Sequence, residues 1–588
     1  MGVDSAPPTL SDRLNHEPRE LKFGTSGRRG PVVDLTQLEV YINALAEVEH
    51  LQTLPLADGG IVRGEEVYFA YDLRPSSTQY VAEEQGRGEI AQAIVCALTD
   101  GGMKAINLGC IPTPALTSFA ISKGKGSIMV TGSHIPFDRN GYKTNTSRGE
   151  LLKHHEGPIG RKVGEVRERL YGQPFTDSLF DEHGRFKSGH RELPGAINDA
   201  RDAYIERYVS FAGPDSLAGL RVLFYQHSAV GRELVPEISE RMGAVVIRAG
   251  YSDTFVPIDT ENIDAAQLAT IQALADDAVE KHGRIDAVLS TDGDSDRPLV
   301  LAVDEKSGQV QFYGGDLVGM IVAEYLGADA VVVPISCNDA IDRGPLAAVT
   351  EPKTRIGSPY VIAGMEAAVA KGRGTVCGWE ANGGFLTGSD IVRDGRMLRA
   401  LPTRDAVLPL IGVLLSAKAK GVSLPALFAS LPKRFSCAAL LKQFPRATAL
   451  LIIDRFTPAD AAIKDVFFEE GAVVAQNEAG VEMQTVDTSE LRAIRADLGN
   501  FFSAAKGFAS IERLNYTDGV RVLFANGDVA HLRPSGNADE LRIYAVADSR
   551  GRAEEITAKG TSEPHGILRA MERAVATSFV EGAAGGSR

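Results

Sequence analysis

The sequence predicts a multidomain α/β protein in which three α/β units precede a final α+β unit. Its 588 residues are several times the length of about 150 residues that is typical of one domain. Along the first two thirds of the chain, segments that look like strand, turn and helix alternate, which is typical of parallel α/β layers. Hydrophobic residues make up 44% and charged residues 24%, so the chain can fill several cores.

The strand and helix pattern restarts along the chain and then changes in character near residue 431. We therefore expect a flexible N-terminus at 1–20, α/β domains at 21–205, 206–312 and 313–430, and an α+β domain at 431–588. In the last of these, helices and short antiparallel strands are expected, with a turn at the tripeptide NGD. The polar segment 145–200, rich in His, Arg and Gly, is interpreted as an insertion or a long surface loop.

Composition and charge exclude several classes of function. The formal net charge is −15 and no run of Lys and Arg interrupts it, so neither nucleic acid nor an acidic membrane is expected as a partner. The first residues contain no basic segment followed by an apolar one, and no later run approaches 18 apolar residues. A cytoplasmic protein is the resulting expectation. The five cysteines lack the spacing of a zinc site or a disulfide framework.

Three aspartates alternate in the segment TDGDSDRP at 291–298, directly after the strand-like run IDAVLS. In an extended chain, alternate side chains face the same way, so Asp292, Asp294 and Asp296 can surround one hard cation. A calcium-binding EF-hand loop is a poor match, because Arg297 stands where its glycine belongs. An arginine beside a metal suits an anionic ligand, which favours Mg²⁺ holding a phosphate over a solvated acidic turn.

Two glycine-containing loops in the first domain offer phosphate-binding chemistry. In the segment MVTGSHIPFDRNGYK, a predicted strand runs into Ser133 and His134, with Lys143 downstream. A serine in such a turn can project its hydroxyl into a cleft, where basic neighbours steady a phosphoryl group. In FGTSGRRG at 23–30, backbone amides and two arginines, including Arg29, can bind phosphate. Taken alone, a plain turn is the more common explanation of each loop.

Two later segments carry side chains suited to sugars and phosphates. In CGWEANGGFLTGSD, Glu380 and Asn382 precede paired glycines, and a carboxylate with an amide is an apt pair for sugar hydroxyls. In LRPSGNADELRIY, an arginine fork, a hydroxyl and an amide match the acceptor oxygens of a phosphate. These three residues are Arg533, Ser535 and Asn537. A surface turn and a hairpin loop remain the alternatives for these segments.

In chain order, these five segments resemble the successive signatures of the α-D-phosphohexomutase superfamily, of the phosphomannomutase/phosphoglucomutase type. The resemblance covers about residues 20–545 and implies four domains in a heart-shaped arrangement around a central cleft, the first three of related topology. It makes Ser133 the catalytic phosphoserine, which would bind one Mg²⁺ together with the three aspartates of 291–298. The charged groups that it places around the phosphoserine are Arg29, His134 and Lys143.

The resemblance also implies the substrate-binding residues and the reaction. The residues implied to bind substrate are Arg297, Glu380, Asn382, Arg533, Ser535 and Asn537. The reaction would interconvert hexose 6-phosphate and hexose 1-phosphate through a hexose 1,6-bisphosphate, which also serves as activator, in a monomer or homodimer. The segment GWEANGG differs from the GEMSGH pattern of phosphoglucosamine mutases, so we expect mannose phosphates as substrates. A phosphoglucomutase, a phosphoglucosamine mutase, a phosphatase and a non-catalytic sugar-phosphate sensor are the alternatives.

Overall fold

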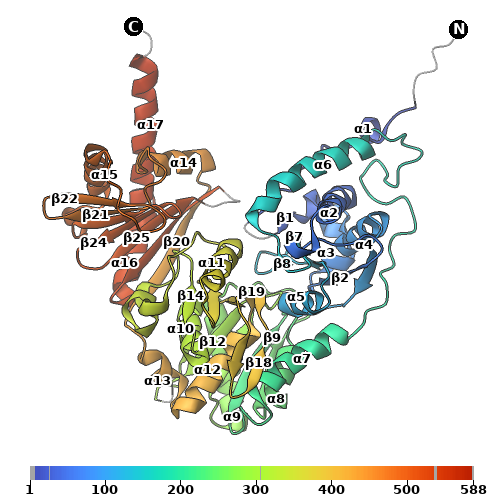
Figure 1. The fold of residues 1–588 in the computed structure, drawn as a ribbon, viewed down its shortest axis with the longest axis horizontal. Helices are drawn as coiled ribbons and strands as arrows, with labels where there is room; N and C mark the ends of the chain where they lie inside the picture. Colours follow the sequence, from blue (N-terminus) through green and yellow to red (C-terminus); the bar gives the residue numbers. More distant parts are fainter. Residues whose placement is uncertain (1–6, 25–26, 262, 305, 535–538, 586–588) are drawn as a thin grey trace. The chain divides into compact units, whose positions relative to one another are not determined.

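The structure, a computed structural model, describes residues 7–24, 27–261, 263–304, 306–534 and 539–585, with side chains described up to residue 576. The chain divides into two compact units, one of residues 1–331 with 357–428 and one of residues 332–356 with 429–588 (Figure 1). Each unit is described here by itself. No helix among the described residues is both long enough and apolar enough to cross a membrane.

The first sheet of the larger unit has the strand order β1-β7-β6-β2-β5, with β8 paired to β7. β2 is parallel to β5 and β6, whereas β7 is antiparallel to β1 and β6. Its strands are β1 (Arg28–Pro31), β2 (Glu66–Tyr71), β5 (Lys104–Asn107), β6 (Ser127–Val130), β7 (Arg139–Thr146) and β8 (Gly149–Glu150). The helices nearest to it in sequence are α2 (Gln37–Leu51), α4 (Ile90–Asp100), α5 (Thr113–Ser122) and α6 (Glu156–Tyr171).

The segment 145–200 is not simply a long surface loop, so that half of the interpretation is wrong, and the interpretation as an insertion stays a prediction. It contains α6, which packs on α2. The buried residues of α6 recur every three or four positions and form one apolar face; they are Ile159, Val163, Val166 and Leu170. The polar residues between them conceal this pattern in the sequence. Residues 10–13, within the segment expected to be flexible, form helix α1, and Leu10 is buried in the same core.

The second and third sheets of this unit continue the α/β pattern. The second has the order β10-β9-β11-β12-β13 and the third the order β14-β15-β16-β19. The strands of the second are β9 (Arg221–His227), β10 (Val245–Tyr251), β11 (Ala287–Thr291), β12 (Pro298–Val303) and β13 (Val310–Tyr313). Those of the third are β14 (Ala330–Val332), β15 (Val376–Trp379), β16 (Phe385–Thr387) and β19 (Leu401–Asp405). The helices that alternate with them are α7 (Asp199–Ala212), α8 (Leu234–Arg241), α9 (Ala265–His282), α10 (Gly315–Leu326), α11 (Ser358–Ala370) and α12 (Val407–Lys420).

The multidomain α/β prediction is confirmed, and the first two sheets contain the expected parallel pairs, but they are mixed sheets that also contain antiparallel pairs. β11 is antiparallel to β12, and β15 is antiparallel to β16. Each of these pairs is joined by a short loop, and a parallel pair would need a longer crossover connection. The two short loops carry the predicted aspartates and the predicted sugar-binding residues, so the antiparallel turns place both segments at the ends of strands.

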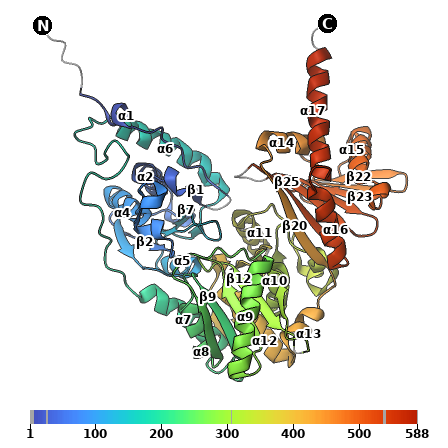
Figure 2. The ribbon, with the colours of Figure 1, turned by 180° about the vertical axis from the view of Figure 1, so that it is seen from behind.

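The smaller unit contains a seven-stranded antiparallel sheet, which confirms the predicted α+β character (Figure 2). Its order is β20-β26-β25-β24-β23-β21-β22, and the predicted NGD turn joins β24 to β25. The strands are β20 (Phe435–Lys442), β21 (Asp465–Glu469), β22 (Ala472–Gln476), β23 (Ile511–Asn515), β24 (Val520–Phe524), β25 (Val529–Pro534) and β26 (Glu540–Ala547). The helices of the unit include α14 (Arg446–Arg455), α15 (Thr488–Phe501), α16 (Arg550–Thr561) and α17 (Ile567–Gly585).

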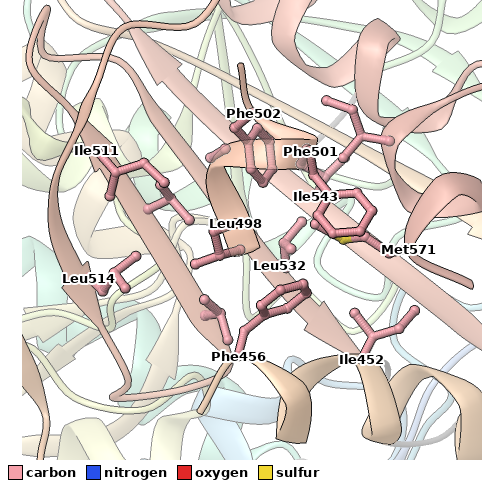
Figure 3. Packing of buried hydrophobic residues seen from close by; sticks show 14 of the residues in the cluster. Ile452, Phe456, Leu498, Phe501, Phe502, Ile511, Leu514, Leu532, Ile543 and Met571 are labelled. Atoms are coloured by element: carbon pink, nitrogen blue, oxygen red, sulfur yellow. The ribbon is translucent and has the colours of Figure 1, made fainter. Parts of the chain in front are cut away.

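One apolar core holds the smaller unit together (Figure 3). Phe456, Leu498 and Phe502 contribute from its helices or their ends, and Leu532 and Ile543 contribute from the sheet. All of these side chains are at most 2% exposed. Since burial of apolar area is the main favourable term in folding, this separate core explains why the segment forms a compact unit of its own.

Candidate functional site

Two loops of the larger unit meet at the predicted serine and aspartates. One follows β6 and carries Ser133; the other joins β11 to β12 and carries the aspartates. They approach so closely that a Cβ atom added at Gly293 would lie 2.7 Å from the carbonyl oxygen of Ser133. Only glycine fits at this contact without displacing the backbone. Residues 159 positions apart are thereby brought into direct contact.

Ser133 is completely buried and directed at the aspartates. Its Oγ donates a 2.7 Å hydrogen bond to Oδ2 of Asp292, and its backbone N–H donates to Oγ1 of Thr131. The φ angle of Ser133 is 55°, in the left-handed region that residues other than glycine seldom adopt. Strained backbone of this kind is concentrated at functional sites, where surrounding contacts hold it in place.

Asp72 and Arg74 supply those surrounding contacts. The Arg74 guanidinium is 1% exposed and donates to four main-chain carbonyls of the serine loop, those of Ser133, Ile135, Pro136 and Arg139. Oδ2 of Asp72 accepts hydrogen bonds from Oγ1 of Thr131 and from the backbone N–H of Gly132. Asp72 and Arg74 also form an ion pair at 3.3 Å, so neither buried charge lacks a partner.

The three predicted aspartates form a candidate metal site. One carboxylate oxygen from each of Asp292, Asp294 and Asp296 lies within 4.8 Å of the others, and all three residues are buried. The Oδ1 atoms of Asp294 and Asp296 are buried and have no hydrogen-bond partner among the described residues. Oxygen atoms in this condition are costly unless a cation binds them, and carboxylate oxygens are the donors that hard divalent cations prefer. The residues present therefore fit a Mg²⁺ ion.

A set of cationic groups surrounds the aspartates. Nζ of Lys143 lies 2.8 Å from Oδ2 of Asp294 and 2.8 Å from Oδ2 of Asp296. Nε of Arg297 lies 3.6 Å from Oδ1 of Asp296, and Nε of Arg29 is buried without a hydrogen-bond partner in the described part of the chain. These cations leave the site with positive charge beside the carboxylates, which suits a phosphate dianion rather than a free metal ion alone.

Burial and neighbouring charges shift the pKa values of this cluster in different directions. Burial, followed by the charges of Asp294 and Asp296, raises the pKa of Asp292 well above its usual value. Burial also raises the pKa of Asp294, but the Lys143 ammonium more than offsets this, so the net pKa is well below the usual value. Burial and the nearby arginines hold the pKa of His134 well below its usual value, so its imidazole is neutral at pH 7.

The loop that joins β15 to β16 in the third sheet carries Glu380 and Asn382. Both residues belong to the larger unit and are 4% exposed. Arg404 of β19 joins this loop to the aspartates: its Nη1 donates to Oε2 of Glu380, and its Nε and Nη2 each lie 3.0 Å from Oδ2 of Asp296. Oδ1 of Asn382 accepts a hydrogen bond from the backbone N–H of Gly384, so this oxygen closes the loop.

The two arginines of FGTSGRRG have different environments, and only one faces the aspartates. Arg28 is buried, and its Nε donates a 2.6 Å hydrogen bond to Oε1 of Glu47, a buried residue of helix α2. Arg29 is its neighbour on β1 and alternates to the other side, where the charges of Arg297 and Asp294 act on it. Burial and Arg297 lower the pKa of Arg29 to about 10, which still leaves it charged at pH 7.

The last predicted segment belongs to the smaller unit. Arg533 lies on β25 and forms an ion pair at 3.1 Å with Asp518, whose Oδ2 also accepts from the backbone N–H of Ile356. Ser535 and Asn537 lie outside the residues that the structure describes.

Comparison with known proteins identifies the family. Models of three domains of the phosphoglucomutase/phosphomannomutase family match this chain: the alpha/beta/alpha domain I at residues 20–169, the alpha/beta/alpha domain III at 314–435 and the C-terminal domain at 460–559. A phosphomannomutase of Sinorhizobium fredii is 35% identical over 92% of this chain and 98% of its own length. A phosphomannomutase of Salmonella muenchen is 34% identical over 90% and 92%.

The fold is also similar to that of solved structures. A phosphoglucomutase/phosphomannomutase family protein of Burkholderia thailandensis aligns with a TM-score of 0.57 at 17% identity, over 94% of this chain and 97% of that one. At this level of identity the likeness concerns the fold alone. Together with the domain matches and the relatives at 34% and 35% identity, it confirms the expected superfamily, and the chain belongs to the phosphoglucomutase/phosphomannomutase family.

Proposed function

We propose that this protein is a phosphomannomutase that interconverts mannose 6-phosphate and mannose 1-phosphate by way of a phosphorylated Ser133. The observation that carries the proposal is the buried 2.7 Å hydrogen bond between Oγ of Ser133 and Asp292, within a cluster of three aspartates. A hydroxyl held there is suited to donate and accept a phosphoryl group, because positioning and charge neutralisation are most of what phosphoryl transfer requires.

One Mg²⁺ ion per site would be held by Asp292, Asp294 and Asp296 together with the phosphoryl group on Ser133. When bound, it would neutralise charge on the transferring phosphoryl oxygens as a Lewis acid. The unpartnered Oδ1 atoms of Asp294 and Asp296 support this assignment. The charge of Lys143 lowers the pKa of Asp294, and the charges of Arg404 and Lys143 lower that of Asp296, so both carboxylates are ionised at neutral pH.

The residues around Ser133 are proposed to handle charge and protons. In the first half-reaction the phosphoryl group moves from Oγ of Ser133 to the free hydroxyl of the sugar phosphate; that hydroxyl loses its proton, and Oγ of Ser133 takes one up to become a free hydroxyl. His134 is neutral at pH 7 and its Nδ1 is buried without a hydrogen-bond partner among the described residues, so it is free to accept a proton there once a bound phosphate offsets the arginine charges that lower its pKa. Arg29 and Lys143 can stabilise the negative charge that develops on the oxygens.

The product of the first half-reaction is a hexose 1,6-bisphosphate. This intermediate must reorient in the site before the second half-reaction, so that its other phosphate faces Ser133. Its other phosphoryl group then moves back to Oγ of Ser133, which regenerates the phosphoserine and releases the isomeric monophosphate. Glu380 and Asn382 are proposed to hold sugar hydroxyls, and Arg297 to hold a phosphate. Arg533, Ser535 and Asn537 are proposed phosphate-binding residues on the resemblance of their motif.

Mannose is proposed as the sugar because relatives that cover nine tenths of this chain are phosphomannomutases. The test is a coupled assay of the full chain with Mg²⁺ and a trace of hexose 1,6-bisphosphate, comparing mannose, glucose and glucosamine phosphates. We expect the largest kcat/KM with mannose phosphate, dependence on the bisphosphate, and loss of turnover on adding EDTA. Release of inorganic phosphate without isomerisation would favour a phosphatase, and binding without turnover would favour a sensor.

Arg404 provides a test of how the sugar-binding loop is coupled to the aspartates. Replacing Arg404 with Lys keeps the charge but removes the fork that contacts both Asp296 and Glu380. Since a hydrogen bond to a charged group contributes about 1.5–3 kcal/mol, we expect kcat/KM to fall about 10- to 100-fold. Arg399→Lys is the control, because Arg399 pairs with Asp390 with its side chain 75% exposed. Equal kcat/KM in the two variants would contradict this coupling.

A further inference from the structure

A cavity of about 350 Å³ in the larger unit shares no lining residue with the site described above. Two segments form most of its wall, one at 80–89 and one at 181–191. The first includes the paired strands β3 (Tyr80–Val81) and β4 (Arg87–Gly88). The second belongs to the irregular part of the segment that follows α6. The volume is within the range of about 300–1,000 Å³ that is usual for pockets that bind small molecules.

Two arginines in this wall form no ion pair with a carboxylate of the described residues. Arg87 donates only to main-chain carbonyls, from Nε to Val33 at 3.2 Å and from Nη1 to His183 at 2.6 Å. Arg185 donates from Nη2 to the carbonyl of Gln85 at 2.9 Å, and its Nε is buried without a hydrogen-bond partner. Among the described residues, no Asp or Glu forms an ion pair with either guanidinium. Burial and the charge of Arg185 lower the pKa of Arg87, and the charges of Asp181 and Asp34 offset this only in part.

The acidic groups in the wall already have partners other than the Arg87 and Arg185 side chains. Oδ1 of Asp181 accepts from the backbone N–H groups of His183 and Arg185 and so closes their turn. Glu89 accepts from Nε2 of Gln37 at 2.8 Å and lies 3.6 Å from Nε of Arg191. The cavity is therefore lined by more cationic than anionic side chains, and the cations are the ones with unused donors.

The backbone of 85–89 is held in an unusual conformation at this cavity. Gln85, Gly86, Gly88 and Glu89 all have positive φ angles, between 54° and 122°. A Cβ added at Gly86 would lie 2.4 Å from the hydroxyl of Tyr80 and 2.5 Å from Nη2 of Arg185, so glycine permits these groups to converge. Gln85 and Glu89 are not glycines, so their left-handed backbone is strained, and such strain is concentrated at functional loops.

Aromatic rings complete the wall. The Arg185 guanidinium lies over the ring of Tyr80, 5.4 Å from its centroid, and Tyr80 is 49% exposed. The rings of Phe186 and His190 contact each other with centroids 4.5 Å apart. An exposed aromatic face beside unpaired guanidinium groups offers a planar ligand a stacking surface and a phosphate a set of donors.

We propose that this cavity is a second ligand site that binds a small phosphate-bearing anion through Arg87 and Arg185. A diphosphate group matches two neighbouring guanidinium groups, each of which can donate two parallel hydrogen bonds. Two sources share this chemistry: free pyrophosphate, and a nucleoside diphosphate whose base stacks on the aromatic wall. The test distinguishes them.

The experiment is isothermal titration calorimetry of the full chain with pyrophosphate, ADP and GDP in buffer containing EDTA. We expect one saturable site, and at least a tenfold weaker Kd in the double variant Arg87→Gln/Arg185→Gln. Because the double variant leaves the candidate active site untouched, its mutase turnover without the probes should equal that of wild type, which also shows that it is folded. Arg297→Gln is the matched control, since it removes one guanidinium from the candidate active site instead.

Tighter binding of ADP or GDP than of pyrophosphate would identify the nucleotide as the source, and equal binding would identify the diphosphate alone. Either outcome supports the site, provided that the double variant loses the binding and Arg297→Gln keeps it. The proposal is overturned if wild type shows no saturable binding of any probe. It is also overturned if Arg297→Gln abolishes the binding while the double variant retains it, because the probe would then occupy the candidate active site.

Discussion

Replacing Ser133 with Ala is expected to reduce kcat for mannose phosphate about 10³-fold or more. The variant removes the oxygen that would carry the phosphoryl group and the donor of the 2.7 Å hydrogen bond to Asp292. No other hydroxyl is placed at that carboxylate among the described residues, so the chain offers no replacement nucleophile. Losses of this size are usual when the nucleophile of a covalent mechanism is removed.

The same variant is expected to lose covalent phosphorylation as well as turnover. Intact-protein mass spectrometry after incubation with hexose 1,6-bisphosphate should show one added phosphoryl group in wild type and none in Ser133→Ala. Ser122→Ala is the control, because the Ser122 hydroxyl donates only to the carbonyl of Phe119 within helix α5. Wild-type turnover in Ser133→Ala would exclude the phosphoserine mechanism, whatever the substrate.

Replacing Asp294 with Asn is expected to weaken binding of Mg²⁺ about 100-fold or more, with a similar loss of turnover at low Mg²⁺. Asn has nearly the same shape but no charge, so it removes one anionic ligand and leaves Lys143 with Asp296 as its remaining carboxylate partner. Even residues that only orient metal ligands change affinity 10- to 100-fold, and loss of a ligand is at least as costly. Raising the Mg²⁺ concentration should restore part of the activity.

Binding of Mg²⁺ is measured directly by calorimetry, and turnover is measured as a function of Mg²⁺ concentration. Asp277→Asn is the control, because Asp277 is an exposed partner of Lys281 on helix α9. We expect that control to bind Mg²⁺ as wild type does. An unchanged Mg²⁺ affinity in Asp294→Asn would show that the three aspartates are not the metal site, and the assignment of Ser133 would then rest on its own test.

The convergence of the three aspartates could be predicted from the sequence because it depends on local geometry. The alternation of Asp292, Asp294 and Asp296 after a run of apolar residues predicted one shared direction along an extended chain. The structure has a turn between β11 and β12 instead, in which Ser295 has a φ angle of 56°, so a short turn brings the carboxylates together. The structure places one oxygen from each within 4.8 Å of the others. The serine loop was predictable in the same way, since a strand running into Gly-Ser is a local pattern. Its meaning nevertheless depended on the other motifs found along the chain.

The residues that hold these loops were missed, because no local pattern distinguishes them. Arg74 and Asp72 lie about 60 positions before Ser133 in sequence, and Arg404 lies 108 positions after Asp296. The segment DLRPSS contains Asp72 and Arg74, and its resemblance to a family stretch was the one signal that could have drawn attention to them. Arg404 had no such signal, because a charged residue near the end of a strand is usually solvated.

The sequence by itself determined the succession of α/β and α+β units, which follows from side-chain periodicity, a property of neighbouring residues. It also indicated the family, through the resemblance of five ordered motifs to known signatures. Only the tertiary structure decided that Arg28 supports the core while Arg29 faces the aspartates, and that α6 packs on α2. It also decided that Ser133 reaches Asp292. Such contacts depend on how distant strands and helices pack together, and packing is a cooperative property of the whole folded unit.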